Sequence, residues 1–199
     1  MHLFYTKSSP YANSVRMVIT ALGVGSEIEM IEAHPFQDHP QLLQANPLGK
    51  VPCLVDNGET ILDSEVICDY LDANISGGQL FNPVYADWRL KTFYSVCSGL
   101  IDASVARRIE FLRDKEGLKS AFWWQRQSDA IGRTLDYLAA RLSLLPEAMC
   151  VLPIQLMAAL GYLDFRHSDI NWREQSPALA AFFEANKTQG WYLDNPFSD

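Results

Sequence analysis

Over residues 1–77, strand-like and helix-like apolar patterns alternate, and this order constrains the fold more than any other feature of the sequence. Val15, Val18 and Ile19 recur at helical spacing, and Asn57-Gly58 is typical of a two-residue hairpin turn. The predicted elements are, in order, strand 2–6, helix 10–22, strand 27–33, a short helix within 39–47, two strands within 51–63 and helix 64–75. Strand–helix–strand units pair their strands in parallel and a hairpin pairs them antiparallel. We therefore expect a small mixed sheet with helices packed on it, in the order βαβαββα.

A composition break over residues 76–83 (SGGQLFNP) separates this region from one in which every pattern is helical. Residues 151–165 are strongly apolar, as a central bundle helix would be. Two further stretches carry apolar residues at helical spacing, namely Leu90, Phe93, Tyr94, Cys97, Leu100 and Ile101 in one, and Ile131, Leu135, Leu138, Leu142 and Leu145 in the other. We expect an α/β domain over 1–77, a linker over 78–83 and an all-α domain over 84–199.

The charge, the apolar runs and the cysteines limit which partners and which compartment this protein is expected to have. A formal net charge of −8 repels phosphate backbones, so no nucleic acid is expected, and the short Arg107-Arg108 pair is expected on a solvated helix face. No run approaches the ~18 apolar residues of a membrane span, and no targeting pattern is present, so we expect a cytoplasmic protein with no membrane partner. Reduced, mostly buried thiols are expected for the scattered cysteines, Cys53, Cys68, Cys97 and Cys150.

An αβ domain followed by an all-helical domain resembles the layout of the cytosolic glutathione S-transferases, and three segments add to the resemblance. SSPYANSVR (8–16) resembles the active-site turn of the serine-type members, in which Ser-Pro opens the first helix. NPLGKVPCL (46–54) resembles the loop before the third strand, where the family has a cis bond between valine and proline. LDSEVICDYL (62–71) resembles the acidic-Ser pair and helix that hold the γ-glutamyl end of glutathione, and GYLDFR (161–166) resembles a helix of certain bacterial members. The resemblance implies a thioredoxin-like first domain, a helical-bundle second domain and glutathione as co-substrate, with no metal or other cofactor.

Ser9 is the candidate catalytic residue. A thiol of pKa ~8.5 is mostly protonated at neutral pH, and a hydroxyl that donates a hydrogen bond to the thiolate lowers that pKa. A residue directly before Pro10 also lies at a helix N-terminus, where free N–H groups and the helix dipole favour an anion. Two alternatives stay open, that Ser9 only caps the helix and that Ser8 is the donor. In the family the key residue directly precedes the proline, so the resemblance implies Ser9.

The other contacts with glutathione are also implied by the resemblance. The backbone of Val51, ahead of a cis Pro52, would pair with the cysteinyl part, and Lys50 would reach the glycine carboxylate. Asp63 would pair with the γ-glutamyl ammonium. Ser64 would cap the following helix and, with the free N–H groups there, bind the γ-glutamyl carboxylate. The alternatives are that Lys50 is a plain surface residue and that Asp63 and Ser64 only complement the helix end.

The resemblance implies a glutathione transferase that directs the thiolate at a small, largely apolar electrophile, with Tyr11 in the second-substrate pocket, and a homodimer. Two other functions remain open. A glutathione-dependent disulfide reductase or peroxidase is less compatible with the sequence, because such reductases generally place a cysteine where this chain has Ser9. A non-catalytic interaction module of the same fold often lacks the Ser-Pro turn or the acidic-Ser pair, and both are present here.

One departure from the family concerns the start of the apolar helix over 151–165. The family usually has a Ser/Thr-x-x-Asp capping box there, whereas this chain has CVLP (150–153). Cys150 is a poor cap, and Pro153 cannot bond back as an aspartate would. We expect the helix to form with a weaker start, at a cost of about 1 kcal/mol.

Overall fold

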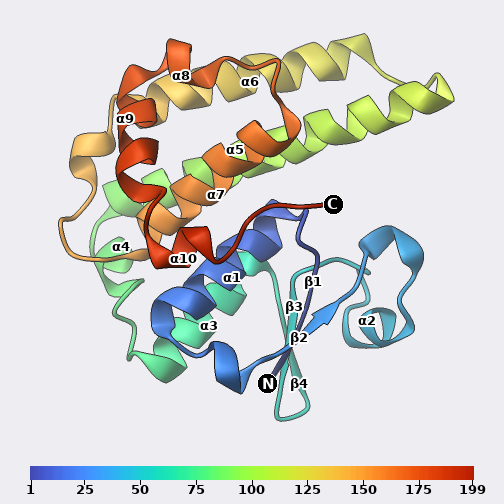
Figure 1. Cartoon of the computed structure of the whole chain (residues 1–199), viewed down its shortest axis with the longest axis vertical. Coiled ribbons are helices and arrows are strands. Elements are labelled where there is room, and N and C mark those ends of the chain that lie inside the picture. Colours follow the sequence, from blue (N-terminus) through green and yellow to red (C-terminus); the bar gives the residue numbers. More distant parts are fainter. The chain divides into compact units, whose positions relative to one another are not determined.

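The structure is a computed structural model that describes the backbone of residues 1–199 and every side chain except that of Pro35. It divides into two units: Met1–Asn82 with Gln189–Asp199 form the first, and Pro83–Thr188 form the second. Figure 1 shows the helices and strands of both units. Within the described residues, no helix combines the length and the hydropathy that crossing a bilayer requires.

A four-stranded mixed sheet forms the centre of the first unit. Its strand order is β2-β1-β3-β4, with β1 parallel to β2, and β3 antiparallel to both β1 and β4. The elements are β1 (His2–Tyr5), α1 (Pro10–Leu22), β2 (Glu29–Glu32), α2 (Pro40–Ala45), β3 (Cys53–Asp56), β4 (Glu59–Leu62) and α3 (Ser64–Ile75), with 3-10 turns at Gly25–Glu27 and Pro35–Gln37. Asn57 and Gly58 both have positive φ, as a tight hairpin turn requires. The predicted βαβαββα order is therefore confirmed.

Helices cover both faces of this sheet. The helices α1 and α3 pack together on one face, and α2 lies on the other (Figure 1). Val15 on α1 and Leu71 on α3 are fully buried, and Leu42 of α2 packs with Phe4 and Cys53 of the sheet. This packing fixes the positions of the segments that follow β1, precede β3 and follow β4.

The C-terminal segment belongs to the first unit rather than to the helical one. The helix α10 (Gly190–Leu193), red in Figure 1, packs against α1. The backbone carbonyl of Asn195 accepts a hydrogen bond from Nδ2 of Asn13 at 2.7 Å, and its own Nδ2 donates to Oγ1 of Thr20 at 2.9 Å. This grouping differs from the expected domain over 84–199, because the buried polar groups of α1 find their partners in the last residues of the chain.

Asp72 of α3 binds the segment over residues 76–83 through hydrogen bonds. Its carboxylate is fully buried and accepts hydrogen bonds from the backbone N–H groups of Leu80 at 3.0 Å and Phe81 at 2.9 Å, and from the hydroxyl of Ser76. The segment expected to start the linker is therefore an ordered continuation of the first unit.

Helices make up the second unit. The elements are α4 (Asn82–Ala86), which begins at the boundary, α5 (Trp88–Arg113), α6 (Ala121–Ala139), α7 (Val151–Arg166), α8 (Trp172–Gln175) and α9 (Pro177–Asn186), with 3-10 turns at Asp114–Glu116 and Leu142–Leu144. The helix α5 packs against α6 and α7, and α7 is buried over most of its length, as predicted. The predicted seam runs only as far as Leu138, because α6 ends at Ala139 and Leu142 and Leu145 lie beyond it. Cys150 precedes α7 without a capping hydrogen bond, as expected.

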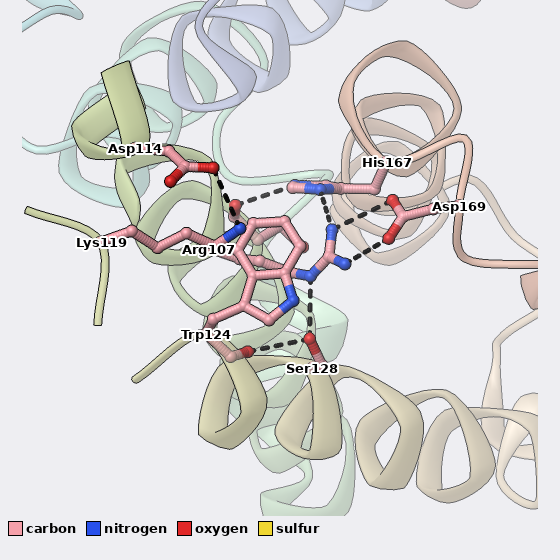
Figure 2. Close-up of polar contacts among 8 residues, drawn as sticks. Arg107, Asp114, Lys119, Trp124, Ser128, His167 and Asp169 are labelled. Carbon is pink, nitrogen blue, oxygen red and sulfur yellow. Dashed lines mark hydrogen bonds and ion pairs between the residues drawn. The ribbon is translucent and has the colours of Figure 1, made fainter. Parts of the chain in front are cut away.

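A polar cluster around the buried Arg107 joins α5, α6 and the segment after α7, with Asp169 at its exposed side (Figure 2). Arg107, expected on a solvated face, is only 3% exposed. Its Nε donates to Oγ of Ser128 at 2.9 Å, its Nη1 donates to Nδ1 of His167 at 2.8 Å, and its guanidinium forms an ion pair with Asp169. Its Cζ also lies 3.8 Å from the centre of the Trp124 ring. The prediction for Arg107 is wrong because its partners come from distant positions that the local pattern does not reveal.

We expect His167 to make the fold sensitive to acid. Arginine can only donate, so Nδ1 of His167 accepts, and Nε2 carries the proton that it donates to the Ser104 carbonyl at 2.9 Å. Burial lowers the pKa of His167 from 6.5 to about 4, and the charges of Arg107 and Arg108 act in the same direction, against Asp169 and the Ser104 carbonyl. Between these pKa values the unfolded chain binds a proton that the folded chain does not. The free energy of unfolding should therefore fall by about 2 kcal/mol between about pH 7 and about pH 4.5.

Urea unfolding at about pH 7 and about pH 4.5 measures this loss. His167→Gln, which is neutral at both pH values, should show a smaller difference between them. An equal difference in the variant would assign the acid sensitivity to other groups.

Candidate functional site

Three segments of the first unit meet at one edge of its sheet. The register pairs Phe4 near the end of β1 with Cys53 at the start of β3, and Cys53 with Leu62 at the end of β4. The turn into α1 follows β1, the Val51-Pro52 bond precedes β3, and Asp63 follows β4. Because β3 runs antiparallel to its two neighbours, these three positions share one edge. The fold thus brings together the segments that the sequence singled out.

Ser9 is half-buried and caps α1. Its backbone is extended (φ −82°, ψ 123°), its Oγ accepts from the N–H of Ala12 at 3.2 Å, and Pro10 is the first residue of the helix. An accepting hydroxyl keeps its hydrogen for donation, so capping and binding of an anion are compatible. Ser8 is also half-buried, with its Oγ 3.5 Å from Oγ1 of Thr6. Both hydroxyls lie in the same turn, and the choice of Ser9 as donor stays a prediction.

The peptide bond between Val51 and Pro52 is cis, as the resemblance implied. Asn46, which sequence reasoning missed, shapes the loop before it: its Nδ2 donates to the Lys50 carbonyl at 2.8 Å and its Oδ1 accepts from the Leu48 N–H at 2.9 Å. An Asn-Pro dipeptide is a recognised turn signal and could have identified this residue. Among the described residues, none hydrogen-bonds to the backbone of Val51, which is 8% exposed.

Asp63, and not Ser64, caps α3. The Asp63 Oδ1 accepts from the N–H of Glu65 at 2.8 Å, and Ser64 is the first residue of the helix. The predicted cap at Ser64 is therefore wrong, and its half-buried hydroxyl is not used for capping. Asp63 has a φ of 75° and a ψ of 134°. Such backbone conformations cost about 1–3 kcal/mol and cluster at ligand sites.

The remaining candidates lie in the same segments. Tyr11 is half-buried in the first turn of α1, and Lys50 is exposed just before the cis bond. Their roles toward a ligand stay predictions. A separate depression of about 560 Å³ lies between the strands and α2, and none of the candidate residues lines it.

The cysteines do not resemble reactive thiols. All four are free and buried. Burial raises the pKa of Cys53 to about 11 and raises the pKa of Cys68 and of Cys97 as well. Nucleophilic cysteines have the opposite shift, because the thiolate is the reactive form. Among the side chains that the structure describes, no group of His, Cys, Asp and Glu residues is arranged to hold a metal ion.

Comparisons with known proteins identify the family of this chain. Residues 3–78 match the family described as "Glutathione S-transferase, N-terminal domain". A solved glutathione transferase family member from Pseudomonas fluorescens Pf-5, with bound glutathione, is 32% identical with a TM-score of 0.89, covering 100% of this chain and 99% of that one. The uncharacterized GST-like protein YibF of Escherichia coli K12 is 28% identical, covering 92% of both chains. A stringent starvation protein A homolog of Pasteurella multocida Pm70 is 34% identical over 43% of this chain and 39% of its own.

Proposed function

Because the chain belongs to the glutathione S-transferase family, we propose that its first unit binds glutathione and activates the thiol for attack on a small, largely apolar electrophile. One observation carries this proposal: the strand register gathers the Ser9 turn, the cis Val51-Pro52 bond and the Asp63-Ser64 pair at one sheet edge. The Pseudomonas relative, which is similar over the whole chain, was solved with glutathione bound. From the family we also propose that this protein is a homodimer and that it is cytoplasmic.

Activation of the thiol is the chemical task of the Ser9 turn. The Ser9 hydroxyl donates a hydrogen bond to the glutathione sulfur, and the N-terminus of α1 stabilises the same negative charge. The thiol proton passes to solvent. The thiolate then forms a carbon–sulfur bond with the electrophile, and a leaving group, where there is one, departs with the electron pair of its bond. Tyr11 lines the pocket of the electrophile.

The other two segments hold the rest of the tripeptide. The free backbone groups of Val51 pair with the cysteinyl residue as an added strand would, and Lys50 binds the glycine carboxylate. Asp63 pairs with the γ-glutamyl ammonium. The Ser64 hydroxyl and the N–H groups that open α3 bind the γ-glutamyl carboxylate. Together, Asp63 and Ser64 match the two opposite charges of that end.

Ser9→Ala is expected to raise the pKa of the bound glutathione thiol by about one unit, because one charge-assisted hydrogen bond to the thiolate is lost. The thiolate absorbance of the complex, titrated against pH, measures that pKa. The affinity for S-methylglutathione, which carries no ionisable thiol, should stay nearly unchanged. Ser8→Ala is the matched control and should leave the thiol pKa as it is. A shift in the Ser8 variant alone would assign the donor role to Ser8.

A non-catalytic interaction module is the second candidate, favoured by the partial similarity to a protein whose name carries no transferase activity. Calorimetry with glutathione separates the two, since the transferase requires binding and an interaction module does not. No heat of binding at millimolar glutathione would favour the module. The disulfide reductase and peroxidase alternatives find no support in the buried cysteines with raised pKa values.

A further inference from the structure

Arg16 is a buried arginine that the proposed mechanism does not use. The residue is 9% exposed, and its Nη1 has no hydrogen-bond partner. The guanidinium Cζ lies 5.5 Å from the centre of the Tyr5 ring. Within the described part of the chain, no carboxylate lies within ion-pair distance of Arg16. Burial lowers the pKa of Arg16, and Tyr5 and Glu32 oppose this change, but an arginine stays charged at any physiological pH.

An unpaired guanidinium in the interior requires an explanation. Arginine is almost never buried without a partner, because removing its charge from water is costly unless an anion or a set of acceptors replaces the water. Asn13, three residues earlier on α1, has a buried Oδ1 without a partner, but its Nδ2 is held by the Asn195 carbonyl. The structure thus holds a fixed positive charge with an unused donor.

The position of Arg16 connects it to the candidate site. Tyr5, which its guanidinium faces, is the last residue of β1 and pairs with Glu32, the last residue of β2. Side chains on a helix lean toward its N-terminus, so Arg16 extends back over the first turns of α1, toward Ser9. The guanidinium therefore lies near the sheet edge at which the Ser9 turn, Val51 and Asp63 meet.

On the basis of the proposed function, we propose that Arg16 is the fixed positive charge of the thiolate site, and that its charge acts through space on the sulfur held by Ser9. Seven residues separate Ser9 and Arg16, a rise of about 10 Å along the helix, and the side chain shortens this distance. A unit charge at about 8–10 Å, in partly screened surroundings, changes the pKa of a thiol by about one unit. Arg16 thus acts on the thiol pKa through its charge and does not contact the sulfur, whereas Ser9 donates the hydrogen bond to the sulfur.

The test compares Arg16→Met with the wild-type chain. The pKa of the bound glutathione thiol, followed by thiolate absorbance, should rise by about one unit, which lowers the thiolate fraction about tenfold at any pH well below that pKa. The dissociation constant of S-methylglutathione should change by less than about twofold, and the melting temperature should not fall, because an apolar isostere often replaces an unpaired buried charge without loss. Arg16→Lys should keep most of the wild-type thiol pKa. Arg126→Met, which removes an exposed charge from the second unit, should leave the thiol pKa unchanged.

Three results would overturn the inference. An unchanged thiol pKa in Arg16→Met, with S-methylglutathione still bound, would remove Arg16 from the thiolate site and leave the proposed function standing. A large loss of S-methylglutathione affinity with an unchanged thiol pKa would assign Arg16 to a carboxylate of glutathione instead. A wild-type chain that binds neither compound would overturn the proposed function and this inference with it. If Arg16→Met does not fold, Arg16→Gln provides the same comparison.

Discussion

Replacing Asp72 with alanine is expected to lower the free energy of unfolding by about 3 kcal/mol or more, the largest single loss that we expect in the first unit. The carboxylate is fully buried and accepts from the backbone of Leu80 and Phe81, which are themselves buried. Each buried N–H left without an acceptor costs about 1–3 kcal/mol, and the lost hydrogen bond from Ser76 adds to this.

Chemical denaturation followed by circular dichroism measures the loss. Asp72→Asn keeps the size of the side chain and one acceptor oxygen, so it should be destabilised less than Asp72→Ala. Asp69→Ala changes a partly exposed carboxylate on the same helix and serves as the control. A loss below about 1 kcal/mol in Asp72→Ala would show that other groups hold residues 76–81 in place.

Replacing Arg107 with alanine is expected to destabilise the second unit by about 3 kcal/mol. The substitution removes the ion pair with Asp169 and the hydrogen bond to Ser128, and leaves the buried Nδ1 of His167 without a donor. It also removes the packing of the guanidinium on Trp124, seen in Figure 2. Because the cluster joins three parts of the helical unit, the cost exceeds that of a surface ion pair.

Thermal and urea unfolding of Arg108→Ala provide the matched comparison, since Arg108 is the next residue and is only half-buried. The Arg108 variant should lose less than about 1 kcal/mol. Equal losses in the two variants would mean that the buried contacts of Arg107 contribute nothing beyond those of a surface arginine.

The parts of the fold that the sequence predicts are those set by local chemistry. Ser9 and Pro10 start α1 and Gly23 ends it, because a cap, a first-turn proline and a left-handed glycine each act on their immediate neighbours. The hairpin at Asn57-Gly58 follows for the same reason. The predicted cap at Ser64 failed because either residue of the Asp63-Ser64 pair can cap, and the sequence does not reveal the positive φ of Asp63.

The parts that could not be predicted depend on partners far away in the chain. Arg107 finds Asp169 at a separation of 62 residues, and Asn13 finds Asn195 at a separation of 182. No local pattern encodes such pairs. For the candidate site, the three segments could be found from the resemblance, but their common edge follows from the strand register, and the burial of Arg16 follows only from packing.

Because residues 189–199 return to α1, the helical unit is inserted in the sequence of the first unit and does not simply follow it. During synthesis, the side chains of Asn13 and Thr20 can therefore form their hydrogen bonds with Asn195 only after the whole helical unit has been made. A fragment that ends at Asn82 lacks both this partner and the helix α10 that packs against α1, so it exposes the part of α1 that the closing segment covers. A chimaera that replaces the helical unit should therefore keep residues 189–199 together with residues 1–82.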